Sequence, residues 1–339
     1  MKNFRNFTRR EISFQAKKNI IIGNNGKGKS NILEALSLPV SPLVESHPEY
    51  LISRGEKTFF IQYSLTQDTL SFSYTLEGKK RKYAIGSKAT TKQNLRSRYP
   101  HVVSFHPQAM NLMYLGPSER RLFLDELLSQ CYPIYRTHLQ KYKKIVQHRN
   151  KVLKNISDQK SSVSELEFWN EKFISSALEI YKYRKKFVRF LESRAQSLNK
   201  FLFGKVETIS FEYISHINLD TIESSLKEAT QQLQSREILL RKTLRGPHLD
   251  DFNIILDGVP LIHYASRGEV KSILLGLKFL ETQYLQEQAA EKEIIFIVDD
   301  ILSELDASHR DLLLEHIDSR QSIISCIEDP GIEGNKIYI

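Results

Sequence analysis

The sequence predicts an α/β fold in which a helical region interrupts a strand-rich core, and three observations support this. Short apolar or alternating segments, typical of strands, fill the first third of the chain. Segments rich in Lys, Gln, Glu and Leu, typical of long helices, run from Ser118 to about Asn199. Strand patterns return after Phe211. The two strand-rich parts are therefore expected to meet in space around an inserted helical domain.

The core takes its expected strands from both ends of the chain. The expected strand Asn19–Ile22 is apolar from Ile20 onward, and Ile294–Val298 is apolar throughout, as buried parallel strands are. Thr58–Leu65 and Thr69–Leu76 alternate like half-buried strands. We expect a discontinuous head, with a mixed sheet flanked by helices and an antiparallel β subdomain, and an inserted α-helical arm. The expected bounds are residues 1–115 and 206–339 for the head and 116–205 for the arm.

Composition excludes several classes of protein. The chain has 339 residues, of which 40% are hydrophobic and 26% charged, which is typical of a folded globular protein. Its apolar runs are too short to span a bilayer, and its first residues lack the apolar core of a signal peptide. Cys131 and Cys326 form no Cys-x-x-Cys pair, which argues against a zinc site and favours a reducing compartment. We expect a cytoplasmic protein with no membrane partner.

The net charge of +9 is concentrated in two segments. Residues 131–205 contain 17 Lys and Arg against 6 Asp and Glu, and residues 79–98 contain 8 Lys and Arg without an acid. Such concentration favours a polyanionic partner, although charge runs are often only solvated helix faces. Phe187 and Phe190 lie among these charges at helical spacing, which favours packing in the core over base stacking. The candidate phosphate contacts are Lys79, Lys80, Arg81, Lys82, Lys182, Arg184, Lys185 and Lys186.

A phosphate-binding loop follows the first apolar strand. Residues 23–30 match the pattern G-x-x-x-x-G-K-[ST], and the amphipathic segment Asn31–Leu38 continues from them as a helix. Glycines let successive backbone N–H groups point at a phosphate, and the helix N-terminus adds partial positive charge. We expect Lys29 to bridge the β- and γ-phosphates of ATP and Ser30 to bind Mg²⁺. The predicted ATP-binding residues are Gly23, Asn24, Asn25, Gly26, Lys27, Gly28, Lys29, Ser30 and Asn31.

Two adjacent carboxylates end the apolar strand 294–298. They lie at the carboxyl edge, where α/β sheets bind ligands. We expect Asp299 to hold Mg²⁺ through water and Asp300 to orient or deprotonate the attacking water, with Lys29 as its catalytic partner. A strand that merely ends in a capping loop is the simpler alternative. The phosphate loop upstream favours the catalytic interpretation.

The segment Ser266–Glu269 starts an amphipathic helix, and its serine lies 33 residues before Asp299. It resembles the signature motif of ABC ATPases, whose serine and helix N-terminus contact the γ-phosphate held by a second protomer. Ser303–Asp306 resembles their D-loop, with Asp306 as its acid. These resemblances imply that ATP joins two copies of the chain and that hydrolysis separates them. The signature residues are Ser266, Arg267, Gly268 and Glu269.

Several further segments match one family pattern: Asn3–Phe7, Asn31–Ala35, Gly116–Asp125, Trp169–Asn170, Gly246–Asp251 and Asp299–Asp306. Together with the motifs above, they resemble the RecF family of recombinational-repair proteins, which are SMC-like ABC ATPases. The resemblance implies an ATP-dependent homodimer that binds double-stranded or gapped DNA and hydrolyses ATP slowly with stimulation by DNA. It also implies recombination-mediator proteins as partners in loading recombinase, replication restart and the SOS response.

Several positions depart from the family pattern. Residues 37–50 follow it poorly, and no switch histidine follows Ile323–Cys326. These departures affect the expected hydrolysis rate and DNA preference rather than ATP binding, and the roles of Asp250 and Asp251 stay open. The single replacements are Val270 for a polar residue, Ala265 for a glycine, Leu249 for an arginine and Gln108 for an acid.

Three alternative functions share parts of this pattern. A nucleotide-binding subunit of a transporter shares the ATP chemistry, but the basic arm and the segments near Gly116 and Gly246 argue against it. A long chromosome-organising ATPase is disfavoured because the 236 positions from Ser30 to Ser266 leave too little chain for a long coiled coil. A loader scaffold with a nearly inactive ATPase stays open because of the altered signature.

Overall fold

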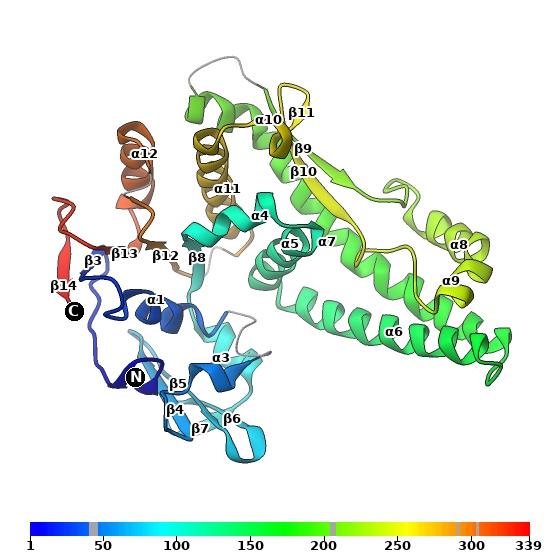
Figure 1. The fold of residues 1–339 in the computed structure, drawn as a ribbon, viewed down its shortest axis with the longest axis horizontal. Coiled ribbons are helices and arrows are strands. Elements are labelled where there is room, and N and C mark those ends of the chain that lie inside the picture. The colour runs from blue at the N-terminus through cyan, green and yellow to red at the C-terminus, as the bar shows by residue number, and fades with distance from the viewer. Residues whose placement is uncertain (41–46, 204–207, 290–291, 303–304) are drawn as a thin grey trace. The chain divides into compact units, whose positions relative to one another are not determined.

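The chain folds into two compact units, residues 1–109 with 274–339 and residues 110–273. The computed structural model describes residues 1–40, 47–203, 208–289, 292–302 and 305–339 (Figure 1). The division into head and arm at residues 116 and 205 stays a prediction.

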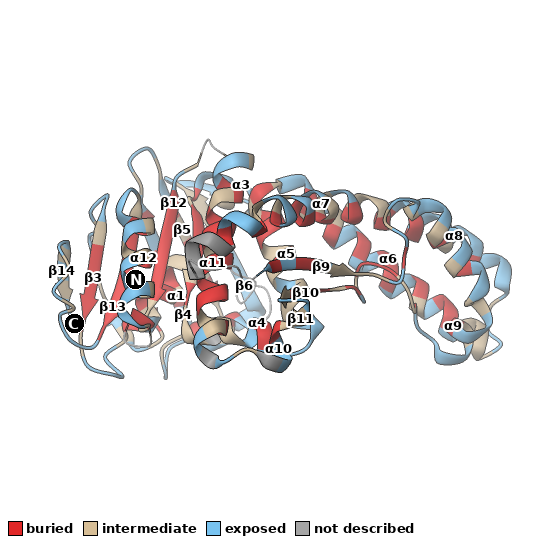
Figure 2. Ribbon diagram, turned by 90° about the horizontal axis from the view of Figure 1, so that it is seen from above, coloured by how far each residue is buried: buried red, intermediate tan, exposed pale blue. Residues whose placement is uncertain are grey.

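A parallel sheet in the order β14–β3–β13–β12–β8 forms one part of the first unit. Each neighbouring pair is parallel. Residues Ile294–Val298 are buried along the whole strand (Figure 2), which explains the unbroken apolar run, since layers on both faces exclude water. The predicted apolar strands are confirmed. The bounds are β3 Lys18–Ile22, β8 His101–Phe105, β12 Ile294–Asp299, β13 Gln321–Cys326 and β14 Asn335–Tyr338.

An antiparallel sheet in the order β2–β1–β4–β5–β6–β7 forms the other part. Its strand β4 alternates between exposed and buried residues as predicted, and the ring of Phe59 meets that of Phe72 on β5 edge-on at 5.3 Å. The bounds are β1 Lys2–Phe4, β2 Phe7–Arg9, β4 Thr58–Ser64, β5 Thr69–Thr75, β6 Lys80–Ile85 and β7 Lys88–Thr90.

Helix α1 (Lys29–Ser37) joins the two sheets through a shared core. Ile32 and Leu33 are buried in the same cluster as side chains of β4, β5, β12 and β13. The hydroxyl of Tyr63 on β4 donates to Ala35 O at 2.8 Å near the end of the helix. The helix that carries Lys29 and Ser30 is therefore fixed from both sides. The other helices with residues in this unit are η1 Pro48–Leu51, η2 Glu77–Lys79, α3 Lys92–Arg98, α11 Arg267–Gln288 and α12 Ala307–Asp318, with η3 Pro107–Met110 at its boundary.

Long helices and a small antiparallel sheet in the order β11–β10–β9 form the second unit. Proline occupies the first turn of both α5 and α6, where its missing N–H costs no hydrogen bond. Phe187 is buried and stacks on the partly buried Phe190 at 6.3 Å, which confirms their predicted packing. The bounds are α4 Asn111–Tyr114, α5 Pro117–Cys131, α6 Pro133–Ser157, α7 Val163–Phe203, β9 Ile209–Ile214, α8 Ile222–Gln232, α9 Gln234–Leu240, β10 Asp251–Leu256, β11 Val259–Pro260 and α10 Leu261–Tyr264.

A buried ion pair holds three helices of this unit together. Arg149 on α6 is 0% exposed and donates to Glu237 on α9 at 2.6 Å. The same guanidinium donates to Asn170 Oδ1 on α7 at 2.9 Å, so the Trp-Asn segment of the family resemblance supplies a partner for a buried charge. Among the described residues, no helix combines the length and apolar character needed to cross a membrane. The predicted α/β fold with a helical insert is confirmed.

Candidate nucleotide-binding site

The loop between β3 and α1 has glycines in the left-handed conformation that is common in phosphate-binding loops. Gly26 and Gly28 have φ angles of 81° and 104°, in the left-handed region that glycine adopts without strain. A Cβ on Gly28 would also lie 2.6 Å from Phe7 Cζ, so both the backbone conformation and the lack of space exclude a side chain here. Residues 24–27 are exposed, so this part of the loop is accessible to a ligand.

Lys29 is held under this loop. Its side chain is 4% exposed, and its Nζ donates to Gly23 O at 2.8 Å and to Asn25 Oδ1 at 3.5 Å. The same Nζ lies 3.5 Å from Asp300 Oδ2. The ammonium thus sits between the loop and the acidic strand end, where a bound triphosphate would exchange these contacts for phosphate oxygens.

Ser30 and Asp299 meet across the sheet edge. The Ser30 hydroxyl donates to Asp299 Oδ1 at 3.2 Å, although 269 positions separate the two residues. A hydroxyl and a carboxylate are oxygen ligands that suit Mg²⁺, which usually takes one or two protein carboxylates together with phosphate oxygens and water. In the described part of the chain, no cluster of three or more His, Cys, Asp or Glu offers an all-protein metal site. The donor set therefore fits a cation that arrives with a nucleotide.

Asp300 has a left-handed backbone, with a φ of 48°. Its backbone N–H donates to Ser325 Oγ at 2.9 Å, and that hydroxyl lies 2.7 Å from Asp299 Oδ1 and 3.1 Å from Asp300 Oδ1. Ser325 was absent from the predicted site. Its signal in the sequence is weak, since it is one of two serines in a buried apolar strand.

The N-terminal segment Asn3–Phe7 braces the loop, a role that sequence reasoning left unassigned. Asn6 Nδ2 donates to Lys27 O at 3.2 Å, and Asn31 Nδ2 donates to Asn6 Oδ1 at 2.8 Å. Arg5 forms a two-point ion pair with Glu34 on α1, with both N–O distances at 2.7 Å. These contacts explain why a family-like opening accompanies the phosphate loop. The predicted role of Asn31 in ATP binding stays a prediction.

The signature residues begin helix α11, and those up to Ile273 belong to the second unit. Ser266 is exposed, its N–H donates to Glu269 Oε2 at 2.6 Å, and Glu269 N–H donates to Ser266 Oγ at 3.2 Å. This reciprocal pair is a capping box, and its hydrogen bonds lower the pKa of Glu269. Among the described residues, a Cβ on Gly268 would meet only Ser266 Oγ, at 3.9 Å, so packing against these residues does not demand this glycine. Val270 is 1% exposed, which accounts for the apolar replacement.

Some predicted residues fall where the structure gives no description. Ser303 and Glu304 of the D-loop lie outside the described residues, as do the side chains of Arg267 and Gln108 and positions 41–46 of the divergent segment. Asp306 is described and caps α12: its carboxylate accepts from the His309 backbone N–H at 2.9 Å and from Ser308 Oγ at 2.7 Å. These hydrogen bonds lower the pKa of Asp306, and the bond from the His309 backbone N–H contributes most.

The predicted basic residues of the first unit lie on its surface. Lys79, Lys80, Arg81 and Lys82 are all exposed at the start of β6. The Arg81 guanidinium lies 5.8 Å from the ring centre of Tyr74 on the neighbouring strand. Lys79 ends η2, and Lys80, Arg81 and Lys82 begin β6, so the four exposed charges lie together where the chain enters this strand.

The four predicted phosphate contacts on helix α7 differ in their exposure to solvent. Lys182 and Lys186 are exposed, beside the rings of Tyr183 and Tyr132. Lys185 is partly covered and donates to Asp220 at 2.9 Å. The inclusion of Arg184 among the phosphate contacts was wrong. Its side chain is 2% exposed and ion-paired at 2.8 Å, because it faces the inside of the unit, where DNA phosphates do not reach.

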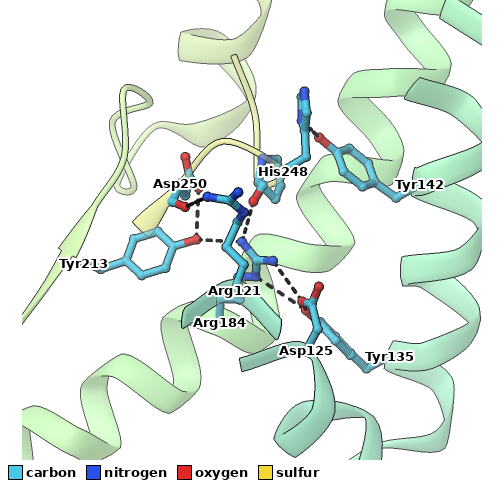
Figure 3. A network of polar contacts seen from close by, with 9 residues as sticks. Arg121, Asp125, Tyr135, Tyr142, Arg184, Tyr213, His248 and Asp250 are labelled. Carbon is cyan, nitrogen blue, oxygen red and sulfur yellow. Dashed lines mark hydrogen bonds and ion pairs between the residues drawn. The ribbon is translucent and has the colours of Figure 1, made fainter. Parts of the chain in front are cut away.

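Arg184 is the centre of a buried polar network (Figure 3). Its guanidinium donates to Asp125 Oδ1 at 2.8 Å and to Pro247 O at 2.6 Å. Tyr213 donates to Asp250 Oδ2 at 2.9 Å, and Arg121 Nη1 donates to Asp250 O at 2.8 Å. Burial raises the pKa of Asp250, and Arg184 opposes this shift. Asp250, whose role the sequence leaves open, therefore contributes to the packing of the second unit.

Asp251, the residue after Asp250, forms an ion pair in the same unit. Arg120 on α5 forms a two-point ion pair with Asp251, at 2.7 and 2.8 Å. The Gly116–Asp125 and Gly246–Asp251 segments of the resemblance are thus bonded to each other, and Arg120 and Arg121 are committed to these bonds. Leu249, which stands where an arginine is usual, is 43% exposed.

Comparison with known proteins decides the family. The sequence profile described as RecF/RecN/SMC N terminal domain matches residues 1–336. The chain belongs to the RecF family. It is 32% identical to the DNA replication and repair protein RecF of Ruminiclostridium cellulolyticum, over 96% of this chain and 91% of that protein. It is also 32% identical to the protein of that name from Acetivibrio thermocellus, over 100% of this chain and 96% of that protein.

A solved RecF structure has the same fold. The structure of the recombination mediator protein RecF-ATP in the RecFOR pathway superposes with a TM-score of 0.89 at 25% identity, covering 99% of this chain and 94% of that one. Full-length membership of the RecF family favours the repair interpretation over a transporter subunit.

Stability of the second unit should depend on the protonation of His248. Burial lowers the pKa of His248 to about 4 from 6.5, and its Nδ1 lies 2.6 Å from the Tyr142 hydroxyl. The unfolded chain takes up this proton below about 6.5 while the folded unit resists it, so stability is complete above 6.5 and is lost towards pH 4. The loss should be on the order of 3 kcal/mol.

Urea unfolding followed by fluorescence of Trp169, the single tryptophan, measures this unit. His248→Gln should reduce the loss of unfolding free energy between pH 6.5 and pH 4. His216→Gln, at an exposed histidine of the same unit, should leave that loss unchanged. An equal loss of stability on acidification in the wild type and in His248→Gln would contradict the assignment of this loss to His248.

Proposed function

We propose that this protein is an ATP-switched DNA clamp of recombinational repair. The gathering of Lys29, Ser30, Asp299 and Asp300 around one phosphate loop carries the proposal, since it supplies a counter-charge, oxygen ligands and a carboxylate base. Membership of the RecF family and the similarity to a protein solved with ATP support it. The chemistry is hydrolysis of ATP to ADP and phosphate, used as a switch.

Each residue has a distinct role in this scheme. Residues 23–28 and the N-terminus of α1 bind the phosphates, and Lys29 turns from Gly23 O to the β- and γ-oxygens. Ser30 and Asp299 would hold Mg²⁺, which neutralises phosphate charge when bound. Asp300 orients or deprotonates the attacking water.

Dimerisation completes the site in our proposal. Ser266 and the N-terminus of α11 contact the γ-phosphate bound by the second copy, and Asp306 belongs to the loop that couples the two sites. The exposed Ser266 and the glycine at position 268, which packing against the described residues does not require, support this role. Closure then depends on the γ-phosphate, and hydrolysis opens the dimer.

Double-stranded or gapped DNA is the proposed partner of the dimer. The exposed run Lys79–Lys82 and the exposed lysines Lys182 and Lys186 supply phosphate contacts, and Lys185 a weaker one. Similarity to proteins named for DNA replication and repair, and to a mediator of the RecFOR pathway, supports cytoplasmic work with recombination-mediator proteins in recombinase loading, replication restart and the SOS response.

Lys29→Ala should abolish ATP-induced dimerisation, because the γ-phosphate loses its counter-charge. Sedimentation velocity with ATP, ADP or no nucleotide measures it. Lys57→Ala, at an exposed lysine of the same unit outside the loop, is the control and should dimerise like the wild type. ATP-driven dimers of Lys29→Ala would refute the clamp.

Asp300→Asn should bind ATP, dimerise and stay closed. Asparagine tolerates the left-handed backbone at this position, so the loop keeps its shape while the base is lost. Hydrolysis should fall by roughly 100-fold or more, measured as phosphate release with gapped DNA. Wild-type turnover in the variant would remove Asp300 from catalysis. A wild-type protein that binds ATP without hydrolysing it, with or without DNA, would instead support the scaffold alternative.

Replacement of Lys80, Arg81 and Lys82 by alanine should weaken DNA binding and flatten its salt dependence. Removal of one phosphate interaction should lower the slope of log K against log salt by about 0.9. Fluorescence anisotropy of labelled duplex across a salt series measures it. Lys227→Ala, at an exposed lysine paired with Glu223, is the control. An unchanged slope in the triple variant would exclude the start of β6 from the DNA interface.

A further inference from the structure

Ser325 is a buried hydroxyl between the two halves of the nucleotide site. It lies in β13, next to β3, which leads into the phosphate loop, and β12, which ends in the two acids. Its register partners are Asp299 on one side and Ile21 on the other. Because residues in register on parallel strands point to the same face, the pairing itself directs this hydroxyl toward Asp299.

One oxygen of Ser325 makes three contacts. It accepts a hydrogen bond from the Asp300 N–H at 2.9 Å, and it lies 2.7 Å from Asp299 Oδ1 and 3.1 Å from Asp300 Oδ1. A hydroxyl has one proton, so it donates to one carboxylate at a time, and the shorter distance favours Asp299. Both acids are thereby tied to one fixed point on the neighbouring strand.

The contact with the Asp300 N–H also stabilises a costly backbone. Asp300 has a φ of 48°, a conformation that non-glycine residues rarely adopt. The bond to Ser325 holds this turn, and the turn places Asp300 Oδ2 3.5 Å from Lys29 Nζ. Without the hydroxyl, the N–H loses this acceptor and the carboxylate can move away from the phosphate side.

We propose that Ser325 is a positioning residue for ATP hydrolysis. It sets Asp299 for its role toward Mg²⁺ and Asp300 for its role toward the attacking water, through a single hydroxyl on the strand between them. This inference rests on the proposed function, and it goes beyond the predicted site, which held no residue of β13.

The same strand provides a matched control. Ser322 is also buried on β13, and its hydroxyl has no hydrogen-bond partner within the described residues. Ser322→Ala removes the same group from the same strand without touching the acids. Ser325→Thr keeps the hydroxyl and adds one methyl group, so it tests whether the oxygen is what matters.

The experiment compares wild type, Ser325→Ala, Ser325→Thr and Ser322→Ala. It measures kcat and KM for ATP with gapped DNA, ATP affinity by calorimetry, and the Mg²⁺ concentration for half-maximal ATP-driven dimerisation. Ser325→Ala should lower kcat by roughly 10- to 100-fold and raise the Mg²⁺ requirement, while ATP affinity at saturating Mg²⁺ changes by less than about threefold. Ser325→Thr should recover most of the kcat, and Ser322→Ala should match wild type.

The outcomes separate this inference from the proposed function. Wild-type kcat and Mg²⁺ requirement in Ser325→Ala would overturn the positioning role while leaving the clamp intact. Equal losses in Ser325→Ala and Ser322→Ala, or a Ser325→Thr variant as impaired as alanine, would show a packing effect and also overturn it. A wild-type protein that neither binds ATP nor dimerises overturns the proposed function, and the inference with it.

Discussion

The parallel pairing of β3, β13 and β12 is the constraint on which the nucleotide site depends. Parallel strands end at the same edge, so the loop after β3, the end of β13 and the acids after β12 must lie together. Ser30 and Asp299 come within 3.2 Å for this reason, although they are 269 positions apart. The buried apolar runs that build these strands are thus as necessary to the site as the polar residues at their ends.

Charge in this protein is used in two different ways. On the surface, the run Lys79–Lys82 is exposed to solvent, and we propose that its charges contact DNA phosphates. Inside the second unit, Arg149 and Arg184 are each surrounded by acceptors, since an unpaired buried charge would cost several kcal/mol. Two segments that resemble the RecF family, 116–125 and 246–251, meet among these buried and paired charges. Their polar residues therefore secure the packing of helices on a small sheet.

The site extends beyond the residues that would touch a nucleotide. Asn6 braces the phosphate loop from the N-terminal strands, and Ser325 ties the two acids from a strand that carries no recognised motif. Both use neutral side chains to orient charged groups, which fixes geometry without adding charge to a crowded site.

The sequence by itself determined the phosphate loop, the acidic strand end, the strands and long helices, and the RecF resemblance, because each depends on local patterns: glycine at left-handed positions, periodicity, and motif spacing. Only the tertiary structure decided that Arg184 is buried, that Val270 belongs to the core, and that Ser325 faces both acids. Burial and strand register join residues far apart in the chain. A charge run on α7 looks the same in sequence whether a given arginine faces water or an aspartate.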